Sequence, residues 1–177
     1  MKYVEHLVKS MEYLAEDPRT IFIGQSVAYS GNSIFNTLKT IPKERKIETP
    51  VFEETQMGLS IGLAMEGYVP VTCYPRFDFL LLAVNQLVNH LDKMEEMTRG
   101  NFKPRVIVRT SIGATVPLNG GVQHTKNHTD AFRHLLENVE VVLLEDKKDI
   151  FSAYQEALNR PDGKSTLLVE FGEYYNE

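Results

Sequence analysis

ETPVFEETQMGLSIGLAMEGYVP, residues 48–70, is the stretch that decides the fold. It joins an extended Thr-Pro segment to a helix predicted from Glu54 to Glu66, whose glycines and other small residues allow close packing. A strand is predicted directly after it, at residues 69–74. A carboxylate at the start of such a helix lies near the positive end of the helix dipole and at the mouth of a parallel sheet, where ligands bind in such sheets. Glu53 is therefore the first candidate site residue.

The rest of the chain alternates between strands and helices. Short β-rich runs predict strands at residues 20–24, 105–110, 139–144 and 166–170, and the run at 20–24, which lacks polar alternation, is expected to be buried on both faces. Apolar residues at three- and four-residue spacing predict helices at residues 4–15, 79–97, 129–136 and 147–159. This alternation predicts an α/β fold, with a mainly parallel, doubly wound sheet and helices on both of its faces.

Length and composition narrow the class of protein. A chain of 177 residues fits one domain, and its formal net charge of −5 argues against a general nucleic-acid binder. No apolar run approaches the roughly 20 residues that a membrane helix needs, and no secretory signal is visible at the N-terminus. The single Cys73 cannot form an internal disulfide. We therefore expect a cytoplasmic protein that binds a small molecule or a protein partner, with no nucleic acid and no membrane.

Three loops are expected to surround the site. In parallel sheets, ligands bind beyond the carboxyl ends of the strands. The segments predicted at that edge are residues 24–33, 74–79 and 110–128, together with the helix start near Glu53. The segment 110–128 is long and contains several glycines and a proline, as functional loops often do.

A set of short motifs spans nearly the whole chain: the Thr-Pro-x-x-Glu segment ending at Glu53, Gly58, Gly62 and Gly67, Phe77-Asp78-Phe79, residues 85–89, 106–109 and 139–144, and Gln123-His124. In combination these motifs resemble the pyrimidine-binding domain of transketolase-like, thiamine-diphosphate-dependent enzymes. They are most similar to the β subunits of 2-oxo acid dehydrogenase E1 components. The resemblance implies the thiamine-diphosphate-binding fold, with residues 1–177 as one pyrimidine-binding domain.

The resemblance implies a catalytic role for Glu53. In that family the Glu of Thr-Pro-x-x-Glu contacts N1′ of the cofactor's aminopyrimidine, and the spacing to Gly67 matches Glu53, with Glu54 as the alternative one position later. A carboxyl group that shares a proton with this nitrogen promotes loss of the proton from the thiazolium C2 carbon, which is the step that activates the cofactor. Without the resemblance, Glu53 would be interpreted as an acid that complements a helix N-terminus.

The resemblance also implies an aromatic residue and a histidine at the site. Phe79 matches the ring that stacks on the aminopyrimidine, and Phe77 is the alternative. A histidine after the Gly-rich loop contacts the substrate or the reacting intermediate in that family, and it can exchange protons near neutral pH. His124 fits the Gln-His pair, while one extra residue before Ala131 leaves His128 open as well.

The other half of the family's site is not recognisable in this sequence. The diphosphate-binding domain carries a Gly-Asp-Gly motif that holds Mg²⁺ and the diphosphate, and no Gly-Asp-Gly occurs here. The family's C-terminal domain is not recognisable either. We therefore expect a separate subunit to supply the diphosphate domain and the metal ligands, in a heterotetramer with two copies of each chain. The helix from Glu54 and the helix from Phe79 are the expected interface surfaces.

Two classes of function follow. The first is a subunit of a split transketolase-like enzyme, which transfers a two-carbon ketol unit between sugars. An E1 β-like subunit for 2-oxo acid decarboxylation and dehydrogenation is the alternative chemistry. The second class is a non-catalytic assembly module that keeps the fold, and the joint presence of Glu53, Phe79 and His124 argues against it.

Overall fold

A six-stranded, all-parallel sheet forms the centre of the structure, a computed structural model that describes residues 1–176. The strands lie in the order β2-β1-β3-β4-β6-β5, and every neighbouring pair is parallel. The predicted α/β class is therefore confirmed. The strands are β1 (Thr20–Gly24), β2 (Lys46–Glu48), β3 (Val69–Tyr74), β4 (Ile107–Ile112), β5 (Glu140–Leu143) and β6 (Thr166–Phe171).

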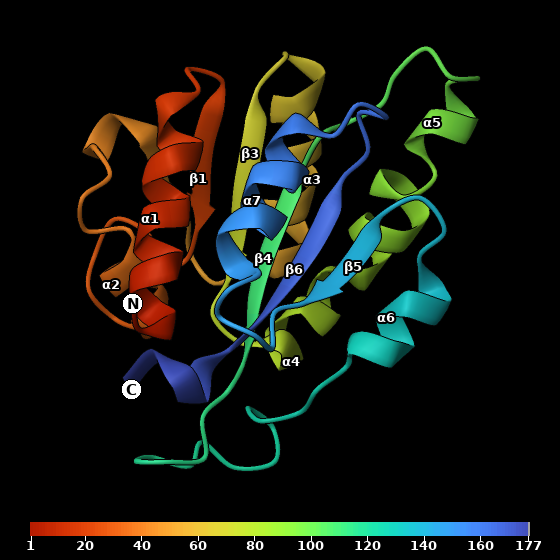
Figure 1. Ribbon diagram of the computed structural model, residues 1–177. Helices are drawn as coiled ribbons and strands as arrows, with labels where there is room; N and C mark the ends of the chain where they lie inside the picture. Colours follow the sequence, from red (N-terminus) through yellow and green to blue (C-terminus); the bar gives the residue numbers. More distant parts are fainter. Residues whose placement is uncertain (177) are drawn as a thin grey trace.

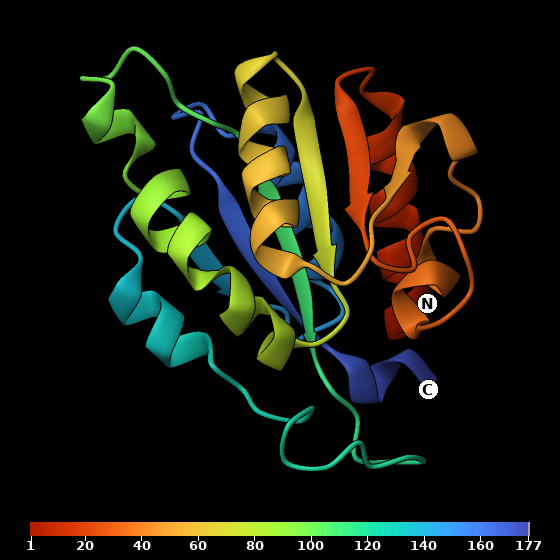
Figure 2. The ribbon, with the colours of Figure 1, turned by 180° about the vertical axis from the view of Figure 1, so that it is seen from behind.

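Helices cover both faces of this sheet (Figures 1 and 2). The helices α1, α2 and α7 lie on one face, and α3, α4 and α6 lie on the other. The bounds are α1 (Tyr3–Glu16), α2 (Ser33–Thr37), η1 (Lys43–Arg45), α3 (Glu53–Met65), α4 (Phe77–Leu80), η2 (Leu81–Ala83), η3 (Asn85–Leu91), α5 (Met94–Met97), α6 (Thr129–Leu135), α7 (Ile150–Asn159) and η4 (Gly172–Asn176).

Each face has its own apolar core. On the first face, α1 buries Leu7, Met11 and Leu14, whose spacing places them on one side of the helix. On the second face, Met57 and Ile61 of α3 pack with apolar side chains of η3 and α6. The central strand β3 is buried along its whole length, which explains why its sequence lacks polar alternation. No helix within residues 1–176 is long and apolar enough to cross a membrane.

The single helix predicted over residues 79–97 is wrong. The chain instead forms α4, a 3-10 turn, the π-helical η3 and the short α5. Asp92 follows η3 with its backbone N–H bonded to the Leu87 carbonyl, a five-residue spacing typical of π-helical turns. Its buried carboxylate accepts the backbone N–H groups of Asn138 and Val139, at 2.7 and 2.9 Å. The interruption therefore places an acid where it anchors the connection between α6 and β5.

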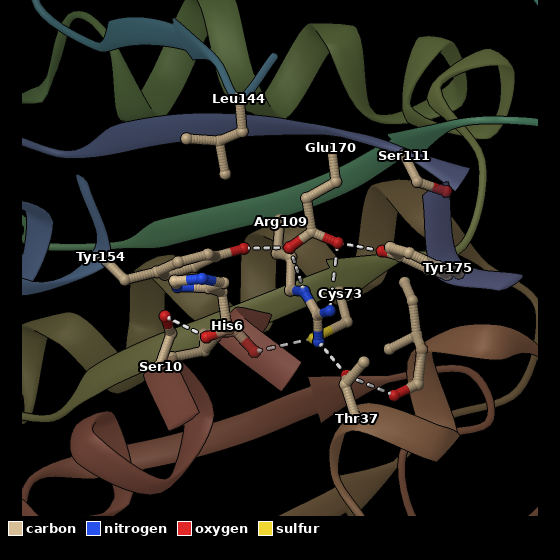
Figure 3. A network of polar contacts seen from close by, with 12 residues as sticks. His6, Ser10, Thr37, Cys73, Arg109, Ser111, Leu144, Tyr154, Glu170 and Tyr175 are labelled. Carbon is tan, nitrogen blue, oxygen red and sulfur yellow. Dashed lines mark hydrogen bonds and ion pairs between the residues drawn. The ribbon is translucent and has the colours of Figure 1, made fainter. Parts of the chain in front are cut away.

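A buried ion pair joins two central strands (Figure 3). Arg109 of β4 and Glu170 of β6 are both fully buried, and the guanidinium meets the carboxylate through two hydrogen bonds. The hydroxyls of Tyr154 and Tyr175 donate to the same carboxylate, and Arg109 also donates to Thr37 Oγ1 at 2.8 Å. Burial lowers the pKa of Arg109, but the Glu170 charge and hydrogen bond, together with Tyr154 and Tyr175, outweigh burial and raise that pKa well above its ordinary value. The network thus connects the sheet with α2, α7 and η4.

Candidate active site at the carboxyl ends of β1, β3 and β4

The chain leaves β1 and β3 in opposite directions. From β1 it passes to the edge strand β2, and from β3 it passes across the sheet to β4. Such a switch point opens a crevice at the carboxyl ends of the two neighbouring strands, where ligands bind in open parallel sheets. Gly24 ends β1 with a φ of +153°, and a Cβ there would lie 2.4 Å from the Cys73 carbonyl oxygen of β3. Glycine therefore allows the two strands to stay paired up to this crevice.

A pocket of about 300 Å³ lies at this switch point. The loops after β1, β3 and β4 all contribute to its wall, so the predicted segments 24–33, 74–79 and 110–128 share one pocket, whereas the helix start near Glu53 does not line it. The long loop after β4 extends beyond the carboxyl end of the sheet (Figures 1 and 2). The lining residues are Gln25, Ser26, Gly31, Asn32, Pro75, Arg76, Phe79, Ala114, Leu118, Gly120 and His124.

Glu48 fixes the loop after β1, which forms the first wall of the pocket. Its carboxylate accepts the backbone N–H groups of Ser26, Val27 and Ala28, at 2.5, 2.9 and 2.7 Å. Ser26 adopts a φ of +56°, a left-handed conformation that a non-glycine residue keeps only when its surroundings support it. The last residue of the edge strand β2 therefore fixes the loop that follows β1.

Ser111 of β4 fixes the segment after β3, which forms the second wall of the pocket. Its hydroxyl donates to the Pro75 carbonyl oxygen at 2.9 Å, and Arg76 Nη1 donates to the same oxygen at 2.8 Å. The segment after β3 is thus tied to the neighbouring strand, and the Arg76 side chain is held at the pocket.

The loop after β4 forms the third wall of the pocket, and its backbone lies very close to neighbouring groups. A Cβ at Gly113 would lie 1.9 Å from the His124 carbonyl oxygen and 3.1 Å from Arg76 Cδ, so any larger residue would displace the loop. A Cβ at Gly120 would also lie 2.9 Å from His124 Cβ. The His124 ring meets the ring of Phe79 edge to face, with 5.3 Å between centroids. Two glycines therefore bring His124 against Arg76 and Phe79.

Glu53 is the first residue of α3 and is buried as a residue. The residue is 8% exposed, and within residues 1–176 no hydrogen bond or ion pair reaches its carboxylate. Its backbone carbonyl accepts the Tyr74 hydroxyl at 3.2 Å, which ties the start of α3 to the end of β3. Glu54 is exposed instead, and its carboxylate accepts Asn85 Nδ2 at 2.9 Å. Of the two adjacent acids, Glu53 is the buried one without a side-chain partner, although it does not line the pocket itself.

The alternative aromatic and histidine residues occupy different surroundings. Phe79 is half-buried at the pocket, whereas Phe77 is fully buried and packs against Phe132 at 5.1 Å. His128 lies against Phe77, and its Nε2 is 3.1 Å from the Asp78 carboxylate. The structure therefore brings Phe79 and His124 together at the pocket and places Phe77 and His128 beside it in a separate contact.

Two residues of the site were missed by the sequence reasoning. Glu48 is recognisable only through its contacts with a loop 20 to 22 positions earlier in the chain. Arg76 had a local signal, since a cation directly after a buried strand and within a predicted site loop stands at the mouth of the sheet.

The comparisons with known proteins agree with this geometry. The family model described as transketolase, pyrimidine binding domain matches residues 9–174. The β subunit of 3-methyl-2-oxobutanoate dehydrogenase from Mycobacterium tuberculosis is 32% identical over 122 residues, covering 67% of this chain and 33% of that subunit. The pyruvate dehydrogenase E1 component subunit β of Chaetosphaeridium globosum is 29% identical over 126 residues, covering 69% and 38%. The chain thus spans little more than a third of the length of these relatives.

Solved structures share the fold. A split gene transketolase, described as an inactive β4 tetramer, superimposes with a TM-score of 0.71 at 19% identity, covering 96% of this chain and 51% of that chain. Transketolase from Leishmania mexicana gives a TM-score of 0.73 at 16% identity, covering 95% and 25%. These likenesses extend over nearly all of the six-stranded architecture.

Proposed function

This chain belongs to the family of transketolase pyrimidine-binding domains, and from that premise we propose that it is one subunit of a split thiamine-diphosphate-dependent enzyme. The observation that carries the proposal is Glu53, a residue only 8% exposed at the start of α3, whose carboxylate has no hydrogen-bond or ion-pair partner within residues 1–176 and still has accessible oxygen surface. A carboxylate that is largely shielded from water but unpaired is available to a ligand that brings a donor. A protonatable ring nitrogen would be such a donor.

The residues present fit the cofactor's aminopyrimidine. Phe79 offers a half-buried aromatic face at the pocket, and His124 lies edge to face against it. When bound, thiamine diphosphate supplies a nucleophilic carbon that attacks a substrate carbonyl. In the proposed mechanism Glu53 shares a proton with the pyrimidine nitrogen and Phe79 orients the ring. His124, and His128 as its alternative, exchanges a proton with the substrate oxygen as charge develops there.

A second subunit completes the proposed site. We propose that a chain with a Gly-Asp-Gly motif supplies the diphosphate contacts and the Mg²⁺ ligands, in a heterotetramer with two copies of each subunit. A groove of about 600 Å³ along α3 supports α3 as part of the contact surface. Leu59 on α3 is half exposed beside Gly58 and Gly62, so a partner can approach the helix backbone closely. The cytoplasmic location predicted from the sequence is part of the same proposal.

The reaction we propose is transfer of a two-carbon ketol unit between sugars. It needs no further carrier for the fragment, and the chain shares its whole fold with a split gene transketolase. The second candidate is E1-type decarboxylation of a 2-oxo acid, which is favoured by the 32% identity to a 3-methyl-2-oxobutanoate dehydrogenase subunit. Both reactions break a carbon–carbon bond next to a carbonyl, and both place the same demand on Glu53.

Proton exchange at the cofactor's C2 carbon tests the shared first step. The chain would be combined with the proposed Gly-Asp-Gly subunit, and exchange would be followed in deuterated water by NMR. We expect Glu53→Gln to slow exchange by about 100-fold or more, because a proton-transfer group contributes about that much. Glu54→Gln is the matched control, since Glu54 is the adjacent but exposed acid, and it should leave exchange unchanged.

Two outcomes would refute the proposal. Exchange at the normal rate in Glu53→Gln would remove the catalytic role of this residue. A wild-type mixture that assembles but binds no thiamine diphosphate would favour the non-catalytic assembly module instead.

A further inference from the structure

Arg76 is a pocket residue whose guanidinium is mostly free of partners. It is half-buried, and its one hydrogen bond within residues 1–176 runs from Nη1 to the Pro75 carbonyl oxygen. The N–H groups of its Nε and Nη2 atoms therefore remain free to donate hydrogen bonds to a ligand. Other partly buried arginines are used differently, since Arg105 caps the carbonyl groups of Leu158 and Arg160 with two nitrogens.

Arg76 is the one Lys or Arg among the described residues that line the pocket, and none of those residues is Asp or Glu. No ion pair within residues 1–176 involves Arg76, whereas Arg19, Arg109, Arg133 and Arg160 each have an acidic partner. The chain as a whole carries a net charge of −5, so this pocket is a local exception to its charge.

The position of Arg76 is fixed from two sides. Ser111 Oγ holds Pro75 at the end of β3, and the Arg76 side chain passes over Gly113, whose missing Cβ leaves room for both Arg76 and the His124 carbonyl. A guanidinium that is held in place and retains free donors suits bidentate recognition of a planar or tetrahedral anion.

We propose that Arg76 binds the anionic group of the substrate, a carboxylate or a phosphate, and so selects anionic over neutral carbonyl compounds. The inference rests on the proposed function, because it assigns a substrate class to the same pocket. The ligand enters with its anionic end toward Arg76 and its remaining polar groups toward Gln25 and Asn32, which also line the pocket. Arg76 is a binding residue in this scheme and takes no part in activating the cofactor.

The test measures anion binding to the chain and to its complex with the Gly-Asp-Gly subunit. Inorganic phosphate and pyruvate are the two probes, titrated separately while the arginine Nε–H signals are followed by NMR. We expect one probe to saturate the Arg76 signal, and Arg76→Met to weaken its binding by about 10- to 100-fold, the value of a charge-assisted hydrogen bond. Arg76→Lys should give an intermediate loss, because it keeps the charge without the planar fork.

A matched variant controls for net charge. Arg19→Met removes the same side chain at the opposite, amino-terminal end of β1 and should leave binding unchanged. Saturation by phosphate would indicate a sugar phosphate as the substrate, and saturation by pyruvate would indicate a 2-oxo acid. The inference is overturned if neither probe saturates the signal, or if Arg76→Met and Arg19→Met behave alike.

The two proposals fail separately. C2 proton exchange needs no substrate, so Arg76→Met should exchange normally in the assembled complex while Glu53→Gln does not. If wild-type exchange is absent but anion binding still depends on Arg76, the enzyme proposal fails and the anion site remains. If exchange is normal but Arg76→Met binds both anions as tightly as wild type, the anion site fails alone.

Discussion

Arg109 and Glu170 face each other across neighbouring parallel strands, with Nε to Oε1 at 2.7 Å and Nη2 to Oε2 at 3.0 Å, and neither side chain is exposed. Two tyrosine hydroxyls donate to the same carboxylate. Charges removed from water in this way stabilise a fold only when every donor and acceptor is satisfied. Both partners are therefore expected to be needed together.

Arg109→Met should destabilise the protein by about 3–5 kcal/mol, because it leaves the Glu170 carboxylate buried without its counter-charge. Urea denaturation at neutral pH measures this loss. Asp17→Asn breaks the exposed ion pair with Arg19 and serves as the control, with an expected effect below about 1 kcal/mol. Equal effects of the two substitutions would contradict the importance of burial.

Alkaline pH should unfold the protein through Tyr154 and Tyr175. Burial, and next the charge of Glu170, raise the pKa of each hydroxyl well above its ordinary value near 10. Above that pH the unfolded chain loses these protons while the folded chain keeps them, so stability is complete below pH 10 and falls as pH rises. Urea midpoints between pH 8 and about 11 measure the fall, and a flat profile would contradict the prediction.

Phe79 and Phe77 should separate cofactor binding from stability. Phe79→Ala is expected to weaken thiamine diphosphate binding by the reconstituted complex about 3- to 10-fold, the value of one aromatic stacking contact. Phe77→Ala should instead cost about 3–5 kcal/mol of folding stability, because that ring is fully buried. Calorimetric titration measures the loss of cofactor binding, and urea denaturation measures the loss of stability. If Phe77→Ala weakened binding and Phe79→Ala weakened stability instead, Phe77 would be the stacking residue.

His124 and His128 can be separated by steady-state kinetics of the reconstituted enzyme. His124→Gln should lower kcat by about 100-fold or more if this ring exchanges the substrate proton. His128→Gln loses the contact with Asp78 and is expected to have the smaller effect, because that ring lies outside the pocket lining. A larger kcat loss in His128→Gln would transfer the role to His128.

Glu48→Gln should loosen the first wall of the pocket. The substitution replaces one acceptor oxygen with a donor, so at least one of the N–H groups of Ser26, Val27 and Ala28 loses its partner, at a cost of about 1–3 kcal/mol. Amide hydrogen exchange at these three residues should accelerate. Glu44→Gln, at an exposed acid four positions earlier, is the control and should leave those amides unchanged.

The sequence predicted the fold class because its strands are short apolar runs and its helices have one apolar side, and these signals are local. Residues 20–24 are buried at four of five positions, as their lack of polar alternation indicated. The break in the helix after Phe79 could not be predicted in the same way. Asp92, which follows the π-helical segment, accepts backbone N–H groups that lie 45 to 47 positions later in the chain, and the local sequence does not show such contacts.

The location of the site was also predictable, because strand direction alone decides which loops meet. Segments 24–33, 74–79 and 110–128 share one pocket, as expected for the carboxyl edge of a parallel sheet. The surroundings of individual side chains were not predictable. Phe77 and Phe79 are two positions apart, and only the packing of Phe132 against Phe77 shows which ring belongs to the core.

The hydrogen bonds that Glu48 and Ser111 make to the pocket loops have a consequence for assembly. Ordering a loop during association consumes conformational entropy, which subtracts from the affinity of the complex. Here the loops after β1 and β3 are already secured by groups of the same chain. A ligand or subunit that binds at this edge therefore meets a preorganised surface. Little of its binding free energy is lost to the conformational entropy of ordering these loops.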